Sequence, residues 1–202
     1  LIARAEALGL RVTRTYGSSE TAGGCVYDGV PLHGTEMRIV GGLVELGGPT
    51  LAEGYLDDEE RTAAAFVESD GRRWYRTGDL GEITDGRLRV LGRSDNVIIS
   101  GGEKISLDAV ERVLHTLPGF DGAVAVAVDD PQWGQSIVVA CERAGAADAA
   151  PGELDAVRGH VASALGNAAR PRALHTLAAL PRLASGKPDR VGLAALLGGR
   201  GD

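Results

Sequence analysis

A short loop near the start of the chain carries residue types that commonly bind ligands. In the run Ser18-Ser19-Glu20-Thr21, hydroxyl groups surround one carboxylate, directly after a segment that alternates as a β-strand should. Proteins that combine helices and strands often place ligands at strand ends of this kind. The same pattern is also typical of a capped turn, so spacing alone leaves both interpretations open.

A second stretch, Gly92–Lys104, predicts a hinge. Its polar residues Ser94-Asp95-Asn96 favour turns and can absorb a large change in backbone angles. The β-branched run Val97–Ile99 fits a strand. The pair Gly101-Gly102 then lets another backbone or a thin ligand come close, although a tight turn with positive φ would use glycine equally well.

Short strands and glycine-rich turns predominate before this hinge. A helix that ends at Gly9 is followed by a strand over 11–16, and Asp57 or Asp58 is placed to cap a helix over 59–66. Further strands are predicted over 36–40, 43–46, 80–83 and 88–91, with Gly41-Gly42 and Asp85-Gly86 as turn signals. The sequence therefore predicts a β-rich piece up to Arg93.

Helices alternate with strands beyond the hinge. Ser106 is placed to cap a helix that ends at Pro118-Gly119, and a second helix is predicted to begin at Pro151. Strands are expected over 123–128, 136–142 and 173–177, a loop over 144–150, and a closing helix over 189–197. We therefore predict two domains, 1–94 and 95–202, the second a compact α+β domain of about a hundred residues.

Bulk composition excludes several classes of function. The net charge of −7 and the pI near 5.1 argue against a nucleic-acid surface. Cys25 and Cys141 have the spacing of neither a metal site nor a disulfide framework, which favours a reducing, cytoplasmic location. No apolar run approaches the ~20 residues of a membrane span. The chain begins at Leu1 inside an amphipathic pattern, so we expect it to start within a domain.

Three separated motifs together resemble the adenylate-forming (AMP-binding) superfamily of acyl-CoA synthetases, adenylation domains and luciferases. They are Tyr16-Gly17-Ser18-Ser19-Glu20, then Tyr75-Arg76-Thr77-Gly78-Asp79 with Gly92-Arg93-Ser94-Asp95, and Ser185-Gly186-Lys187-Pro188-Asp189-Arg190. Gly54-Tyr55-Leu56 resembles part of a fourth. The resemblance implies an α+β fold: the β-rich remainder of a large N-terminal domain over 1–94, followed by a compact C-terminal lid over 95–202.

Within the superfamily, the sequences of three runs are most similar to those of actinobacterial o-succinylbenzoate-CoA ligases of menaquinone biosynthesis. The runs are Thr15–Thr21, Gly24–Gly29 and Gly101–Lys104. The implied activity is an AMP-forming acid-thiol ligase, in which a carboxylate attacks ATP to give an acyl adenylate and CoA then displaces AMP. The alternatives are another acyl- or aryl-CoA synthetase, an adenylation domain that loads a carrier protein, and a non-catalytic remnant or interaction module of the same fold.

The resemblance assigns nucleotide-binding roles in the first part of the chain. Tyr16 would offer its ring to the adenine as a stacking surface, and Gly17 is implied as a further nucleotide-binding residue. Ser19, where the family more often has threonine, keeps a hydroxyl for the α-phosphate, and Glu20 would hold Mg²⁺ as a catalytic carboxylate. Asp79 would accept hydrogen bonds from the two ribose hydroxyls and Arg93 would add donors. A surface ion pair is the structural alternative for Asp79 and Arg93.

The remaining roles fall in the second part of the chain. Lys187, which a loop would ordinarily leave solvated, is implied to bridge the carboxylate and α-phosphate during adenylation. Asp95 is implied as the hinge pivot, and Gly101 and Gly102 as lining the CoA channel. The implied partners are a small carboxylic acid, ATP and CoA, with no nucleic acid and no membrane, and a homo-oligomer is left open. The superfamily's phosphate loop does not occur in this sequence, so we expect the chain alone to lack ligase activity.

Overall fold

The computed structural model describes residues 2–143 and 149–198, which form two compact units, Leu1–Ser94 and Asp95–Asp202. The first unit has two sheets and one apolar core, and the second has one sheet with an apolar core on each face. None of the helices in these ranges has the length and apolar character that crossing a bilayer requires. The predicted loop over 144–150 falls largely outside the described residues.

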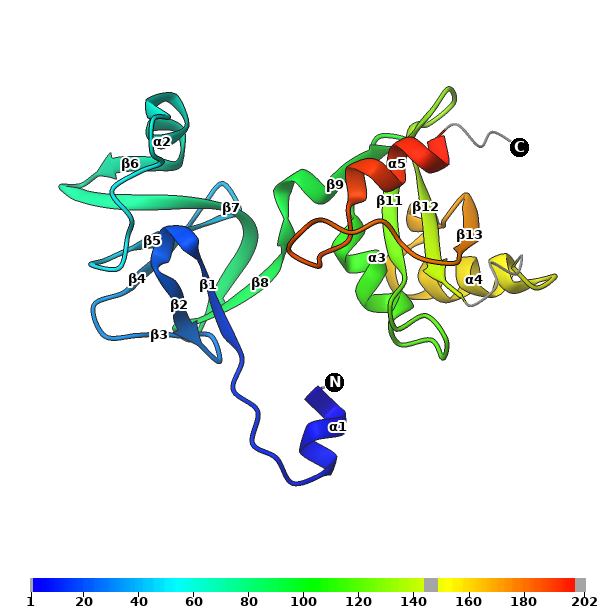
Figure 1. The fold of residues 1–202 in the computed structure, drawn as a ribbon, viewed down its shortest axis with the longest axis horizontal. Coiled ribbons are helices and arrows are strands. Elements are labelled where there is room, and N and C mark those ends of the chain that lie inside the picture. Colours follow the sequence, from blue (N-terminus) through cyan, green and yellow to red (C-terminus); the bar gives the residue numbers. More distant parts are fainter. Residues whose placement is uncertain (1, 144–148, 199–202) are drawn as a thin grey trace. The chain divides into compact units, whose positions relative to one another are not determined.

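The first unit is built on antiparallel strands (Figure 1). After α1 (Ile2–Ala7), β1 (Thr15–Ser18), β2 (Gly23–Tyr27) and β3 (Val30–Pro31) form one sheet. The larger sheet has the order β4-β5-β7-β6, with β8 paired to β7. Its strands are β4 (Glu36–Val40), β5 (Leu43–Gly47), β6 (Phe66–Ser69), β7 (Arg72–Thr84) and β8 (Arg87–Arg93).

Local chemistry explains several of these elements. Asp58 caps α2 (Glu59–Ala65) by accepting a hydrogen bond from the amide of Arg61. Of the two candidates, Asp57 and Asp58, the cap is therefore Asp58. Gly41 and Gly42 both adopt positive φ in the β4–β5 hairpin, which confirms that turn. The bounds predicted for the first strand were wrong. β1 starts at Thr15, where pairing with β2 begins, and not at Arg11.

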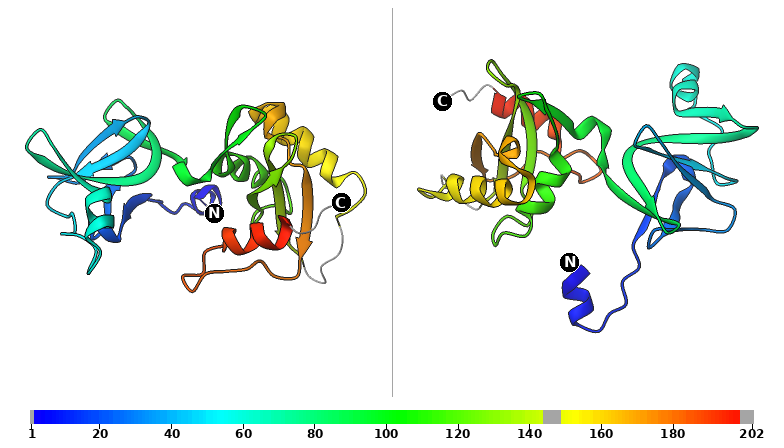
Figure 2. Two further views of the ribbon diagram at one scale, coloured as in Figure 1. Left: turned by 90° about the horizontal axis from the view of Figure 1, so that it is seen from above. Right: turned by 180° about the vertical axis from the view of Figure 1, so that it is seen from behind.

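The second unit has one mixed sheet with helices on both faces. The order is β10-β9-β12-β11, with β13 parallel to β12. Figure 2 shows α5 on one side of this sheet and α3 and α4 on the other. The strands are β9 (Val97–Ser100), β10 (Glu103–Ser106), β11 (Val124–Asp130), β12 (Gly134–Glu142) and β13 (Ala173–Leu177); the helices are α3 (Leu107–Leu114), α4 (Glu153–Leu165) and α5 (Arg190–Gly198).

Alternation along the strands gives this sheet two cores. Ala125, Ile137 and Val139 face α3 and α4, whereas Val126 and Val138 face α5, because successive strand residues point to opposite faces. Ser106 caps α3 through the amide of Ala109, as the sequence predicted. That helix ends at Leu114 and not near Leu117, which lies in the following turn. The fold is the α+β arrangement that the sequence predicted.

Candidate functional site

An aspartate near the middle of β7 is the centre of a polar cluster in the first unit. Asp79 pairs in register with Arg93 on β8, and the Arg93 guanidinium Nη1 lies 3.4 Å from Asp79 Oδ1. The other carboxylate oxygen, Oδ2, accepts a hydrogen bond of 2.6 Å from the Tyr16 hydroxyl. The Asp79 side chain is 17% exposed, so this carboxylate still faces solvent at one edge. The ion pair that sequence reasoning raised as an alternative is therefore present.

Residues just before Asp79 hold it at this position. The buried Thr77 hydroxyl donates to the Val44 carbonyl on β5 and accepts from the Asp79 amide. Gly78 has φ of +73°, and a Cβ there would lie 3.1 Å from the Arg93 guanidinium. Glycine is therefore favoured here by the positive φ, and a side chain would also press against the Arg93 guanidinium.

The β1–β2 corner brings Tyr16 and the hydroxyl loop to the same place. A Cβ on Gly17 would lie 1.9 Å from the Gly23 carbonyl oxygen, so only glycine lets the two strands approach at this corner. Tyr16 is partly buried against the apolar core. Burial, reinforced by the bond to Asp79, raises the pKa of its hydroxyl far above the ordinary value, so it remains a protonated donor.

Glu20 faces Tyr55, which comes from the loop before α2. The Tyr55 hydroxyl donates a hydrogen bond of 2.6 Å to Glu20 Oε1, and the Arg61 guanidinium stacks 3.8 Å above the Tyr55 ring centre. Burial alone would raise the pKa of Glu20, but hydrogen bonds led by that from Tyr55 hold it below its usual value. Glu20 is thus an ionised carboxylate at neutral pH.

These groups line one cavity of about 410 Å³. Its lining is mostly polar, with the carboxylates of Glu20 and Asp79 and the side chains of three arginines, Arg61, Arg76 and Arg93. Burial raises the pKa of Tyr75, which also lines it, to about 12. The cavity combines hydroxyl donors, acceptor oxygens and a cation, which suits a polyhydroxylated or phosphorylated small molecule.

The structure brings together some of the predicted residues and leaves others apart. Tyr16, Gly17, Glu20, Asp79 and Arg93 all line this cavity. Ser19 lies in the short helix η1 (Ser19–Thr21), is exposed, and is not among the lining residues.

The other predicted residues belong to the second unit. Asp95 lies in η2 (Ser94–Asn96), directly before β9. Gly101 and Gly102 form the β9–β10 turn, both with positive φ, so the tight-turn interpretation of this pair is confirmed. Lys187 is exposed, and its ammonium group makes no hydrogen bond or ion pair with any described residue.

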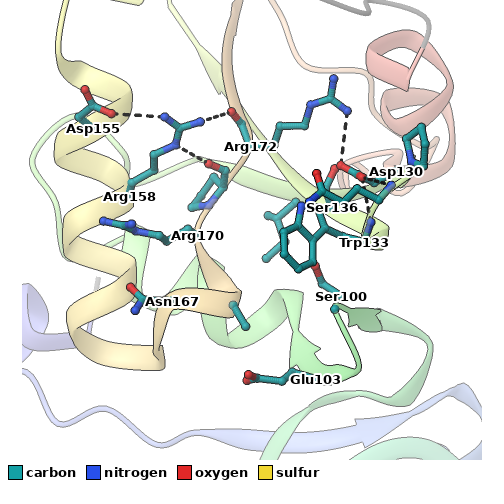
Figure 3. Close-up of a pocket in the computed structure, with 16 residues that line it drawn as sticks. Ser100, Glu103, Asp130, Trp133, Ser136, Asp155, Arg158, Asn167, Arg170 and Arg172 are labelled. Atoms are coloured by element: carbon teal, nitrogen blue, oxygen red, sulfur yellow. Dashed lines mark hydrogen bonds and ion pairs between the residues drawn. The ribbon is translucent and has the colours of Figure 1, made fainter.

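A larger cavity of about 1090 Å³ lies in the second unit beside Gly101 (Figure 3). Figure 3 shows Arg158 and Arg170 on one side of it and Trp133 and Asp130 on the other. The Trp133 residue is 52% exposed, and its carbonyl accepts a hydrogen bond from the Gly101 amide. An exposed aromatic ring facing arginines suits a ligand with a flat apolar part and an anionic part.

Three residues, Tyr55, Trp133 and Glu111, have contacts or positions that the sequence alone did not indicate. The sequence singled out Tyr55 only as part of a motif, and nothing in the spacing paired it with Glu20, 35 positions away. Trp133 belongs to none of the sequence motifs, yet it lines the second cavity. Glu111 also belongs to none of the motifs, yet its side chain is only 12% exposed and binds Arg190. Long-range pairs of this kind leave no periodic signal.

No group of three or more His, Cys, Asp or Glu residues that could hold a metal ion occurs among residues 2–143 and 149–198. A single ionised carboxylate remains compatible with Mg²⁺, because that ion is commonly held by one or two carboxylates together with substrate phosphates and waters. Glu20 meets this requirement through its lowered pKa and its place in the cavity lining.

Comparison with known proteins gives consistent matches. Residues 109–187 match the family described as "AMP-binding enzyme C-terminal domain". A probable 2-succinylbenzoate-CoA ligase of Mycobacterium tuberculosis is 41% identical over 202 residues, covering 98% of this chain and 51% of the relative. The chain thus spans about half the length of this relative.

Solved structures agree with the sequence match. The o-succinylbenzoate-CoA synthetase (MenE) of Bacillus subtilis in complex with the acyl-adenylate intermediate OSB-AMP is 28% identical, with a TM-score of 0.81, covering 95% of this chain and 43% of that one. A variant of E. coli MenE with bound OSB-AMS is 29% identical, with a TM-score of 0.80, covering 98% and 43%. The chain therefore has the fold of the adenylate-forming enzymes, and its residues 109–187 match the family of AMP-binding enzyme C-terminal domains.

Proposed function

We propose that this chain supplies part of the active site of an ATP-dependent carboxylate-CoA ligase that forms an acyl adenylate and then a CoA thioester, with o-succinylbenzoate as the acid. The observation that carries the proposal is the convergence of Tyr16, Glu20, Asp79 and Arg93 on one cavity. The relatives named 2-succinylbenzoate-CoA ligases support the choice of acid.

The cavity has the groups that binding of an adenylate needs. Asp79 Oδ1 and the Arg93 guanidinium would contact the ribose hydroxyls, while the Tyr16 hydroxyl holds Asp79 Oδ2 and so fixes the carboxylate. The Tyr16 ring would then present its apolar face to the adenine. Glu20 would hold Mg²⁺ together with ATP phosphates, and the ion would supply neutralisation of phosphate charge.

Lys187 would act in the adenylation step. Its ammonium group has no partner among the described residues, so it is available to bridge the substrate carboxylate and the α-phosphate as negative charge gathers between them. Asp95 would serve as the pivot that presents first Lys187 and then Gly101 and Gly102 to the substrate. The cavity beside Gly101 would suit the phosphates of CoA, because the Arg170 guanidinium lines it and has no partner in the described part of the chain.

The test uses a fused ligase, in which this chain replaces the matching half of the Mycobacterium tuberculosis relative. ATP–pyrophosphate exchange over a panel of carboxylic acids should be fastest with o-succinylbenzoate, and added CoA should give the thioester. Lys187→Ala should lower exchange by about 10²- to 10³-fold, the usual effect of losing one preorganised donor, yet spare thioester formation from a supplied acyl adenylate. An equal fall in both half-reactions would contradict the role of Lys187.

The same assay separates the alternatives. Preference for another acid would point to a different acyl- or aryl-CoA synthetase. Transfer to a pantetheinylated carrier protein but not to CoA would point to a carrier-loading domain. Absence of exchange with every acid, while the unmodified relative is active, would favour a non-catalytic member of the fold.

A further inference from the structure

A partly buried ion cluster in the second unit includes Arg190, which follows Lys187 by three residues. The Arg190 guanidinium Nη2 donates to both carboxylate oxygens of Glu111, at 2.8 and 2.6 Å. Glu111 Oε1 also accepts from the Ala125 amide at 2.8 Å. One carboxylate therefore joins α3, the start of β11 and the first residue of α5.

A second carboxylate connects this cluster to the hinge segment. Asp108 Oδ1 accepts a hydrogen bond of 3.0 Å from the Asn96 side-chain amide and lies 3.7 Å from Arg190 Nη2. Asn96 is the last residue of η2, next to Asp95. The same oxygen thus faces both the hinge segment and the start of α5.

The connection from Arg190 to Lys187 is short and is held by several hydrogen bonds. The Asp189 carboxylate accepts from the Gly192 amide, and the Asp189 amide donates to the Pro181 carbonyl. Pro188, which has a fixed φ, forms an isolated bridge with Arg182. The Leu183 amide donates to the Lys187 carbonyl, closing a tight turn over 183–187. A displacement of Arg190 would therefore move Lys187 with it.

Stability alone does not account for this cluster. Burial raises the pKa of Glu111 even though Arg190 is beside it, so the surroundings disfavour the ionised form. The Arg190 Nε atom is buried without a hydrogen-bond partner. Apolar residues such as Leu193 and Leu197 already anchor α5 to the sheet, and buried ion pairs often stabilise a fold no better than apolar substitutes do. Hydrogen bonds between charged groups are directional, so they also fix the orientation of Arg190 relative to its carboxylate partners.

We infer that Arg190, held by Glu111 and Asp108, is a positioning residue that sets the location of Lys187 relative to the hinge segment. The inference rests on the proposed role of Lys187 in adenylation. Arg143 offers a matched control, because it forms a comparable two-bond pair with Glu153 at 28% side-chain exposure, against 30% for Arg190. Neither Glu153 nor the Phe120 ring beside Arg143 belongs to the 183–187 turn.

The first experiment measures amide hydrogen exchange in this chain. Arg190→Gln should speed exchange at the Leu183, Gly186 and Asp189 amides at least about tenfold, while the β12 amides keep their protection. Arg143→Gln should leave the turn amides unchanged. The inference would be overturned if Arg190→Gln left amide exchange in the turn unchanged, or if it raised exchange equally in the turn and in β12. Either result would do so whatever the activity of the enzyme.

The second experiment measures both half-reactions in the fused ligase. Arg190→Gln should lower ATP–pyrophosphate exchange by about 10- to 100-fold, because a displacement of about 1 Å is enough for such a loss, and leave thioester formation from supplied acyl adenylate unchanged. Equal losses in both half-reactions, or an equal effect of Arg143→Gln, would reduce Arg190 to a structural role. If the unsubstituted fused ligase shows no ATP–pyrophosphate exchange, the proposed function fails. The amide hydrogen-exchange measurement on this chain still decides whether Arg190 positions the turn.

Discussion

Replacing Tyr16 by phenylalanine removes one hydroxyl from the centre of the first-unit cavity and leaves the ring in place. The lost bond is the 2.6 Å contact to Asp79 Oδ2, an acceptor that is 17% exposed. Hydrogen bonds to charged groups contribute about 1.5 to 3 kcal/mol. Because Asp79 keeps Arg93 and some contact with water, we expect a loss near the lower limit, about 1.5 kcal/mol.

The two tryptophans of the chain make this change measurable in one unit. Trp74 is buried in the first unit, and Trp133 is exposed in the second, so in a Trp133→Phe background the fluorescence of Trp74 reports unfolding of the first unit. With a urea m-value of about 1.5 kcal/mol/M, Tyr16→Phe should lower the midpoint by about 1 M.

Tyr27→Phe is the matched control. Tyr27 is 39% exposed and its hydroxyl has no hydrogen-bond partner among the described residues, so its loss should change the stability by no more than about 0.5 kcal/mol. If Tyr16→Phe destabilises the first unit no more than Tyr27→Phe does, the contact between Tyr16 and Asp79 does not organise the cavity.

Three single sites provide further tests. Gly78→Ala, which places a Cβ at positive φ against Arg93, should destabilise the first unit by about 1 to 3 kcal/mol in the same urea assay. A hydrogen bond from Arg143 holds the pKa of Glu153 below its usual value. The pair therefore stabilises the second unit at pH values above the pKa of Glu153 in the unfolded chain, and this stabilisation is lost as the pH falls through the pKa in the folded chain. Glu153→Gln should therefore weaken the fall in the free energy of unfolding at acidic pH, as followed by circular dichroism. Burial raises the pKa of the Cys141 thiol to about 11. Iodoacetamide near neutral pH should therefore alkylate Cys141 far more slowly in the native chain than in urea. Equal alkylation rates would contradict the burial of Cys141.

Local patterns were sufficient to predict many elements of this fold. The strand over 173–177 and the hairpin around Gly41-Gly42 were predicted with the observed bounds or nearly so, because both depend on near neighbours in sequence. The first part of β7 was missed because Arg72–Asp79 mixes charged, aromatic and glycine residues without alternation. Those residues form a strand because β5 and β6 pair with them on either side.

The site shows the same division between local and long-range information. The motif residues Glu20 and Asp79 were identified through a resemblance, but their fixed partners Tyr55 and Tyr16 are 35 and 63 positions away. The position of Glu111 lies off the apolar face of α3, and only the fold shows that Arg190 and the Ala125 amide bind it. Polar pairs formed by tertiary packing have no signature in spacing or composition.

The proposed function requires that the first-unit cavity bind a nucleotide. Titrating this chain with AMP while recording amide proton–nitrogen correlation spectra tests this requirement most directly. A nucleotide site predicts saturable shifts confined to the Gly17, Gly78 and Asp79 region, and their loss in Asp79→Ala. Shifts that never saturate, or that are the same in wild type and Asp79→Ala, would contradict it.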